Sequence, residues 1–331
     1  MKAIVFDHPG GPDVLCLAEV PDPVLGRGEV LLKVRATALN RADILQRQGF
    51  YPPPPGASDI LGLEASGTVV AIGDGVSNWT LGDQVCALLS GGGYAELAAV
   101  PAGQLMPLPA GLDLLTASAV PEAFLTAHDN LVTRGRLGAG ATVLIHGGSG
   151  GVGTAAIQVA RRLGATVLTT ARSAERLERC RQLGATGLIN YRTDDIPARV
   201  RELTGGRGVD VVLDIMGASY LALNLDALTE DGCLVEIGLQ GGARTEVDLA
   251  LMLRRRLTLI ATTLRSRPPE QKAEIVARAT REVLPGFADG TLRAVVAAVY
   301  PLGDAALAHR AMEAGGHFGK LLLDVQGAGA G

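Results

Sequence analysis

Aromatic side chains are scarce in this chain of 331 residues and make up only 3% of it. Lysine and arginine number 30 against 34 acidic residues, which gives a formal net charge of −4. Proteins that bind single-stranded nucleic acid use basic grooves with aromatic stacking platforms, and anionic membrane surfaces also attract basic proteins. The composition therefore weighs against nucleic acid or a membrane surface as the main partner.

Cysteine is also rare, and Cys16, Cys86, Cys180 and Cys233 lie far apart with no paired spacing. Such a pattern in a long chain is typical of reduced thiols in a cytoplasmic protein. No apolar run reaches the ~20 residues that a membrane-spanning helix needs. The first residues meet a charge and a Pro-Gly turn too early for a signal peptide. We therefore expect a cytoplasmic location and no membrane span.

Hydrophobic residues account for 47% of the chain and charged residues for 19%, which predicts a sizeable packed interior. The 44 glycines and 17 prolines stand singly or in short clusters between apolar runs, as they do at turns. The length suits two domains better than one. The sequence is that of a globular protein.

Short apolar runs separated by Gly and Pro turns fill the first third, which predicts an irregular, mainly antiparallel β domain. These runs are Val30–Val34, Thr68–Ile72, Gln84–Leu89 and Tyr94–Val100.

From Ala141 onward, apolar strands alternate with helical stretches, a pattern that predicts a parallel sheet covered on both faces. The expected strands are Ala141–His146, Ala165–Ala171, Gly187–Asn190, Val209–Ile215, Gly232–Gly238 and Leu257–Thr263, with helices over Gly151–Leu163 and Ser173–Leu183. Six such strands match a doubly wound α/β Rossmann sheet.

The chain ends with a helical segment, Glu270–Phe287, and two apolar runs, Ala294–Tyr300 and Gly319–Leu323. We interpret these as a return to the first domain, so that the Rossmann domain is an insertion. The predicted organisation is a catalytic β domain over residues 1–122, a cofactor domain over 123–265 and the return over 266–331.

A glycine-rich loop follows the first Rossmann strand, and Gly148, Gly150 and Gly153 satisfy the pattern G-x-G-x-x-G. Between a strand and a helix, this pattern predicts a dinucleotide site, because glycines allow a tight turn and close approach of the pyrophosphate. The amides at the helix start, over Gly151, Val152 and Gly153, would then bind phosphate. The alternative is a loop that merely turns the chain.

The second Rossmann strand lacks the acidic residue that usually binds the ribose 2′-hydroxyl of NAD, about 20 residues past the glycines. Arg172, Ser173 and Arg176 follow the strand instead, and these residues suit the 2′-phosphate of NADPH. The alternative is that both arginines are solvated residues at the start of a surface helix.

Several segments along the chain together resemble a known family. They are Ala38–Asp43, Gln46–Gly49, Pro53–Gly56, Ile60–Gly67, Leu144–His146, Gly151–Ala156, Leu264–Arg267 and Gly319-Lys320. The sequence is similar to the zinc-independent quinone oxidoreductases of the medium-chain dehydrogenase/reductase superfamily, and it looks closest to the tumour-suppressor-inducible subgroup.

The resemblance implies a partly open, GroES-like β-barrel domain beside the Rossmann domain, with the active site in the cleft between them. Zinc-containing relatives carry cysteine where this chain has Asn40 and histidine where it has Leu63, and neither residue suits a thiolate/imidazole zinc site. We expect no metal. Gly150 departs from the subgroup, which carries serine there, while Ser149 lies one position earlier.

Carried over residue by residue, the resemblance assigns the remaining site residues. Asn40 and Tyr51 would line the nicotinamide and substrate region, and Thr126 would contact the nicotinamide. Along the dinucleotide would lie the loop Gly148, Ser149, Gly150, Gly151, Val152 and Gly153, then Arg172, Ser173, Arg176 and Tyr191 at the 2′-phosphate, Gly238 and Leu239 beside it, and Leu264 and Arg265 at the nicotinamide end.

Tyr51, followed by Pro52–Pro55, is a candidate hydrogen-bond donor on a stiff loop, and the alternative is an aromatic lid that only packs on the substrate. Asp43 and Glu64 could help a nicotinamide cation electrostatically, but an ion pair with Arg41 is the simpler expectation. The run Arg254-Arg255-Arg256 is expected to form a solvated turn.

The favoured function is NADPH-dependent reduction of a quinone, which is already electron-poor and needs little polarisation without zinc. Reduction of α,β-unsaturated carbonyls is the nearest alternative, and a low-turnover NADPH-binding protein that senses redox state is another. The apolar run Leu257–Leu264 at the sheet edge predicts a homodimer.

Overall fold

The computed structural model describes residues 1–327. By its contacts the chain forms two compact units, which divide after Leu125 and again before Leu264. Unit 1 combines Met1–Leu125 with the chain from Leu264 onward, and unit 2 is Thr126–Thr263. Within residues 1–327, the longest helices are too short or too polar to cross a membrane.

Unit 1 contains a sheet in the strand order β14-β15-β3-β4-β5-β7, with β6 also paired to β3 and a separate pair β1-β2. The last strand, β15 (Lys320–Asp324), pairs antiparallel with β3 (Glu29–Ala38), so both ends of the chain build one sheet. Buried Val30, Leu32 and Val34 alternate along β3 with more exposed residues, the period of two that the sequence indicates.

The other elements of unit 1 are β1 (Lys2–Val5), β2 (Cys16–Glu19), α1 (Arg41–Arg47), β4 (Glu64–Ile72), β5 (Gln84–Leu88), β6 (Leu97–Pro101), β7 (Leu105–Pro107), α2 (Leu114–Ala117), α9 (Pro269–Glu282), α10 (Pro285–Ala288), β14 (Val296–Pro301) and α11 (Ala305–Ala314), with the 3₁₀ turns Pro12–Val14, Ala102–Gln104 and Leu302–Asp304. Helix α3 (Pro121–His128) runs across the boundary of the two units.

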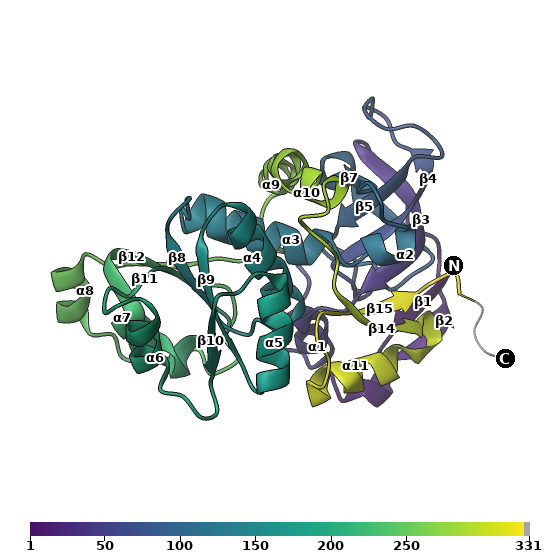
Figure 1. Ribbon diagram of the computed structural model, residues 1–331. Helices are drawn as coiled ribbons and strands as arrows, with labels where there is room; N and C mark the ends of the chain where they lie inside the picture. Colours follow the sequence, from purple (N-terminus) through teal and green to yellow (C-terminus); the bar gives the residue numbers. More distant parts are fainter. Residues whose placement is uncertain (328–331) are drawn as a thin grey trace. The chain divides into compact units, whose positions relative to one another are not determined.

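Unit 2 is a doubly wound parallel sheet in the order β10-β9-β8-β11-β12-β13, as predicted. All five strand pairs are parallel. Helices α4 and α5 pack together, as do α6 and α7 (Figure 1). The chain reverses its winding direction at β8 (Thr142–Ile145), so the carboxyl end of this strand is the switch point where such folds bind ligands.

The remaining elements of unit 2 are a π-helical turn (Asp129–Arg134), α4 (Gly151–Arg162), β9 (Thr166–Ala171), α5 (Ala174–Leu183), β10 (Gly187–Asn190), α6 (Ile196–Leu203), β11 (Val209–Asp214), α7 (Leu221–Ala227), β12 (Leu228–Glu236), α8 (Leu249–Arg255) and β13 (Thr258–Ala261), with a 3₁₀ turn over Gly217–Ser219.

Two expectations about local structure are wrong. The helix expected over Glu270–Phe287 breaks after Glu282 and restarts at Pro285, because proline has no amide hydrogen for the preceding turn.

The run Arg254-Arg255-Arg256 is not a solvated turn, since it closes α8. Its Arg255 donates to the carbonyls of Leu225, Asp226 and Leu228 at the end of α7.

The glycine-rich loop depends on close backbone contacts at two of its glycines. A Cβ on Gly148 would overlap the Thr169 hydroxyl, and one on Gly153 would overlap the carbonyl of Gly147. Gly150, the N-cap of α4, has φ −80°, and a Cβ there would meet its nearest atom at 3.4 Å. The fold therefore requires glycine at 148 and 153 and tolerates a side chain at 150.

We predict that Gly148→Ala and Gly153→Ala each destabilise the protein by ~1–3 kcal/mol, because an added methyl group overpacks a tight contact. Gly150→Ala is the matched control in the same loop, and its melting temperature should stay within about 1–2 °C of wild type. Thermal unfolding followed by circular dichroism measures both. Equal losses in all three variants would show that the contacts do not distinguish these positions.

Candidate functional site

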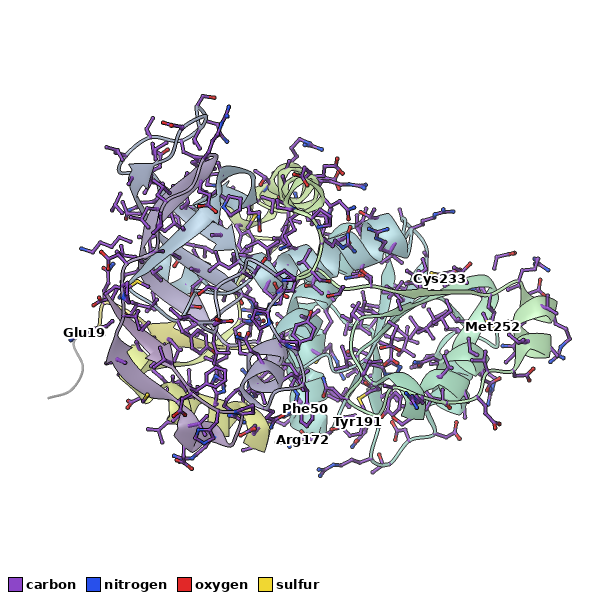
Figure 2. The ribbon with its side chains drawn as sticks, turned by 180° about the vertical axis from the view of Figure 1, so that it is seen from behind. Glu19, Phe50, Arg172, Tyr191, Cys233 and Met252 are labelled. Atoms are coloured by element: carbon purple, nitrogen blue, oxygen red, sulfur yellow. The ribbon has the colours of Figure 1, made fainter. Side chains whose placement is uncertain are left out.

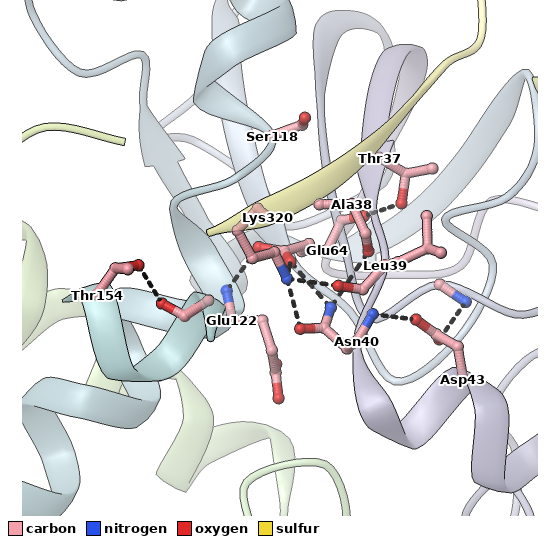
Figure 3. A network of polar contacts seen from close by, with 12 residues as sticks. Thr37, Ala38, Leu39, Asn40, Asp43, Glu64, Ser118, Glu122, Thr154 and Lys320 are labelled. Carbon is pink, nitrogen blue, oxygen red and sulfur yellow. Dashed lines mark hydrogen bonds and ion pairs between the residues drawn. The ribbon is translucent and has the colours of Figure 1, made fainter. Parts of the chain in front are cut away.

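The ammonium group of Lys320 lies at the centre of a buried polar network in unit 1 (Figure 3). It donates to the Glu64 carboxylate at 2.7 Å, to Asn40 Oδ1 at 2.6 Å and to the carbonyl of Leu39 at 2.7 Å. An ammonium group has three hydrogens. All three are therefore used within unit 1.

Glu64 is fully buried, and both of its carboxylate oxygens accept hydrogen bonds. Oε1 accepts from Lys320 and from Asn40 Nδ2 at 2.9 Å, while Oε2 accepts from the backbone amide of Glu122 at 2.9 Å. This arrangement ties β4, β15, the start of α1 and the start of α3 together. The Glu64 carboxylate thus accepts three hydrogen bonds, one of them from a cation.

The predicted site residue Asn40 stands before the first residue of α1 and is 9% exposed. Its side-chain amide donates to Glu64 and to the carbonyl of Ala38, and its oxygen accepts from Lys320. The polar atoms of Asn40 are thus bound within unit 1, and its direct contribution is to position Lys320 and Glu64.

The expected ion pair of Asp43 or Glu64 with Arg41 is wrong, because Glu64 pairs with Lys320 instead. Asp43 accepts from the amides of Asn40 and Gly62, at 2.7 and 3.1 Å, and from the Tyr94 hydroxyl. Burial raises the pKa of Asp43 to about 6. It closes the first turn of α1, as a carboxylate at a helix start commonly does.

Arg265 holds the loop of Tyr51 in place. It is 4% exposed, and it donates to Tyr51 O at 3.2 Å, to Ser90 O at 2.8 Å and to Gln46 Oε1 at 2.6 Å. Its guanidinium carbon lies 5.3 Å from the centre of the Tyr51 ring, within the range of a cation–π contact. The sequence placed Arg265 and Tyr51 at the nicotinamide end, and the structure brings these two together.

Glu122 is a residue that the sequence analysis did not single out. It is the second residue of α3 and is half-buried. The pKa of Glu122 is raised to about 8, chiefly by burial and also by the neighbouring Glu64 charge, against the opposing effect of Lys320. The only sequence signal was a glutamate after proline at a helix start, which is common on protein surfaces.

In unit 2, the loop after β8 leads directly into α4, as the sequence predicts. Gly147 has φ +68°, and the amide of Gly148 donates to Thr170 O at 3.0 Å. The amides of Gly151, Val152 and Gly153 lie in the first turn of α4, where no intrahelical acceptor precedes them. Such a turn presents free amides and a partial positive charge to an anion.

The predicted 2′-phosphate residues come together at the end of β9. Ser173 is the N-cap of α5, and Arg176 in its first turn donates to the Ser149 hydroxyl at 3.3 Å. Burial and the adjacent Arg172 charge lower the pKa of Arg176. The amide of Tyr191 bonds Ala171 O at 3.2 Å, which puts Tyr191 beside Arg172, and Figure 2 labels both.

Gly238 and Leu239 follow β12 at the same edge of the sheet. The amide of Gly238 donates to Glu236 Oε1 at 3.3 Å, and Leu239 is 56% exposed. Burial, together with the nearby Asp214 carboxylate, raises the pKa of Glu236 to about 8. This acidic pair, with Asp214 buried and Glu236 half-buried, is a second feature that the sequence did not indicate.

Of the other predicted residues, Leu264 is 9% exposed beside Arg265 in unit 1, and Thr126 accepts from Asn130 through its carbonyl at 2.8 Å on α3. The predicted set thus falls into two groups: Asn40, Tyr51, Leu264 and Arg265 in unit 1, and the loop, arginine and Gly238 positions in unit 2.

Two family models match the chain. The model for the alcohol dehydrogenase GroES-like domain matches residues 26–110, and the model for zinc-binding dehydrogenase matches residues 151–281. The donors present do not fit zinc: Leu63 is aliphatic, and the Lys320 ammonium lies against Asn40 and Glu64. Within residues 1–327, His, Cys, Asp and Glu side chains form no group of three or more suited to a metal.

Relatives match over nearly the whole chain. A quinone oxidoreductase of Rattus norvegicus is 32% identical over 98% of this chain and 97% of its own length. A 2-haloacrylate reductase of Burkholderia is 32% identical, with 98% of both chains covered. The chain also spans 16% of mycobacterial phthioceranic/hydroxyphthioceranic acid synthases, with 36% identity.

The crystal structure of Escherichia coli quinone oxidoreductase complexed with NADPH superimposes with a TM-score of 0.89. It is 31% identical, and the match covers 98% of this chain and 100% of that one. The chain therefore belongs to the medium-chain dehydrogenase/reductase superfamily of oxidoreductases, with quinone oxidoreductases among its full-length relatives.

Proposed function

We propose that the protein reduces quinones with NADPH and without zinc. The observation that supports this proposal is the Lys320–Asn40–Glu64 network, in which Asn40, at the position where zinc-containing relatives carry a cysteine, is bonded to an ammonium and a carboxylate. Without a Lewis acid, a simple ketone is hard to reduce, whereas a quinone is already electron-poor. The quinone oxidoreductases among the full-length relatives support the same acceptor.

The residues that would hold the cofactor fit a dinucleotide. The α4 amides would bind the pyrophosphate, with Gly148 and Gly153 leaving room for its approach. Arg172 and Arg176 would bind the 2′-phosphate, and Gly238 with Leu239 would lie along the dinucleotide. A bound nicotinamide supplies the hydride, and the protein supplies its orientation and electrostatics.

Reduction of activated alkenes is the second candidate, favoured by the match to a 2-haloacrylate reductase. We further propose a homodimer through the edge strand β13, where Leu259 is exposed; α8, which precedes β13 in the chain, carries the exposed Leu249 and Leu253. The cytoplasmic location stays a prediction.

We predict that the protein oxidises NADPH in the presence of ortho- or para-quinones, with or without metal chelators. The measurement is loss of NADPH absorbance with a panel of both quinone classes and short alkenals. Turnover of alkenals alone would favour the second candidate. Turnover of none would favour a low-turnover NADPH-binding protein that senses redox state.

Replacement of Arg172 and Arg176 by alanine should weaken NADPH binding by about 10- to 1,000-fold and leave NADH binding nearly unchanged. Charge-assisted hydrogen bonds are worth ~1.5–3 kcal/mol each, less where water screens them, and NADH lacks the phosphate that would receive them. Fluorescence titration with each coenzyme measures both affinities. Arg181→Ala is the control, because Arg181 lies on the same helix and pairs with Glu178.

Equal loss of both coenzymes in the double variant would mean that the arginines support the fold. A wild-type preference for NADH would contradict the proposed coenzyme directly.

Tyr51→Phe should slow turnover by roughly 5- to 150-fold, the value of one transition-state hydrogen bond of ~1–3 kcal/mol, without changing NADPH affinity. The phenylalanine ring preserves the contact with Arg265. Tyr51→Leu removes the ring as well. If Tyr51 only packs on the substrate, Phe should keep full activity and Leu should lose it, and steady-state kinetics of both variants separates these readings.

A further inference from the structure

We propose that Glu122 is the proton donor of the reaction, delivering the second hydrogen to the substrate after hydride transfer. This inference rests on the proposed function and names a residue to which no role has been assigned. Four observations support it. Within residues 1–327 the Glu122 carboxyl has no bonding partner, and the nearby cations donate to other groups. Other carboxylates lie close to it, and it stands on α3.

The Glu122 carboxyl has no hydrogen-bond or ion-pair partner within residues 1–327, although the residue is half-buried. Its backbone amide donates to Glu64 Oε2 at 2.9 Å. Figure 3 shows the side chain pointing away from Lys320, with no dashed line at its carboxyl oxygens. A half-buried carboxyl with no donor is destabilised in its charged form and tends to keep its proton.

The nearby cations are bound elsewhere. Lys320 donates its three ammonium hydrogens to Glu64, Asn40 and Leu39. Arg265 donates to Ser90, Gln46 and Tyr51, and Lys272 on α9 donates to the Ser90 hydroxyl.

The charged side chains around Glu122 shift its pKa in both directions. Glu64 on β4 and Asp43 on α1 raise the pKa of Glu122, while Lys320 on β15 and Arg265 lower it. Lys272 is a further charged neighbour that interacts electrostatically with Glu122. The resulting pKa of about 8 leaves the group mostly protonated at neutral pH and able to release its proton readily.

The position of Glu122 on α3 relates it to a residue that the family resemblance assigns to the nicotinamide. Thr126, which the family resemblance places against the nicotinamide, follows Glu122 by four residues on α3. Residues four apart lie on the same face of a helix. Both side chains are only partly buried, so this face of α3 is not closed by the core.

Asp43 is a poor alternative because it is 1% exposed and accepts three hydrogen bonds from unit 1. Tyr51 keeps its proposed role as a hydrogen-bond donor that polarises the substrate. Glu122 differs in that it transfers its proton.

The step balances in atoms and charge. The substrate receives a hydride, which carries two electrons, from the reduced nicotinamide of NADPH. In an α,β-unsaturated carbonyl the β-carbon accepts it, and the α-carbon of the resulting enolate forms a C–H bond as the Glu122 O–H bond breaks. In a quinone, hydride transfer gives the hydroquinone anion, and its phenolate oxygen forms an O–H bond as the Glu122 O–H bond breaks. The Glu122 carboxylate then regains a proton from water.

The test compares Glu122→Gln with Glu122→Asp and with Glu270→Gln as the matched control. Glu270 is also the second residue of a helix that begins with proline, and it is exposed. With a quinone or short alkenal that the wild type reduces, Glu122→Gln should lower kcat by roughly 100-fold, the usual contribution of a general acid. Glu122→Asp should recover part of this loss, and Glu270→Gln should match wild type.

The pH profile provides a readout that a structural role would not alter. Because the acid form must donate, wild-type kcat should be level below about pH 7 and should fall as pH rises through about 8. Glu122→Gln should lack this alkaline limb. Infrared difference spectra of the cofactor-free protein should show a carboxylic acid band that disappears over the same pH range and is missing in Glu122→Gln.

Every other outcome would contradict either the role of Glu122 or the proposed function. Wild-type turnover with an unchanged rate or an unchanged alkaline limb in Glu122→Gln would overturn the role of Glu122 alone. A lower rate at every pH with the limb retained would do the same, because it would show a supporting role. No turnover by wild type with any quinone or alkenal would overturn the proposed function, and the role of Glu122 with it.

Discussion

The buried ion pair between Lys320 and Glu64 is the interaction on which unit 1 depends. It joins the last strand of the sheet to β4, and through Asn40 and the Glu122 amide it also fixes the first turns of α1 and α3. Loss of one partner of such a pair commonly costs 3–5 kcal/mol, because the other charge remains buried without compensation. Replacement of both partners is often tolerated. The pair is therefore better explained by the arrangement of side chains that it imposes than by a gain in stability.

That arrangement supports the proposal of a zinc-free reaction in a fold shared with zinc-binding dehydrogenases. The ammonium of Lys320 provides positive charge but no vacant coordination site, since its three hydrogens are all donated within unit 1. Polarisation of the acceptor must then come from hydrogen bonds and from the substrate's own electron deficiency. Both proposed substrate classes, quinones and activated alkenes, satisfy this requirement.

Local patterns were sufficient to predict the parallel sheet and the glycine-rich loop. Strand and helix periods are properties of neighbouring residues, and Gly148 and Gly153 are required by contacts within a short βαβ unit. The convergence of Arg172 and Arg176 at the end of β9 follows from the same unit. The break before Pro285 was also readable from proline chemistry, but the apolar pattern continued across it and concealed it.

The role of Glu122 could not be predicted in this way, because its environment is built from distant parts of the chain. Its amide bonds Glu64, which lies 58 residues earlier, and Lys320 bonds Leu39 across 281 residues. A sequence shows a glutamate after Pro121 but not which cations near it are already bound. The same limit applies to Asp43, whose expected partner Arg41 was the closest charge in sequence and the wrong one in space.

The start of α3 gives the carboxyl groups of Glu64 and Glu122 different environments. A helix N-terminus favours a negative charge through its free amides and its dipole. Here the Glu122 amide, in the first turn, donates to the carboxylate of Glu64 and not to the side chain of Glu122. Glu64 is thereby stabilised by the helix start as well as by Lys320. Its negative charge repels a second negative charge on Glu122. The amide at the helix start therefore serves Glu64, while burial and the neighbouring Glu64 charge raise the pKa of Glu122.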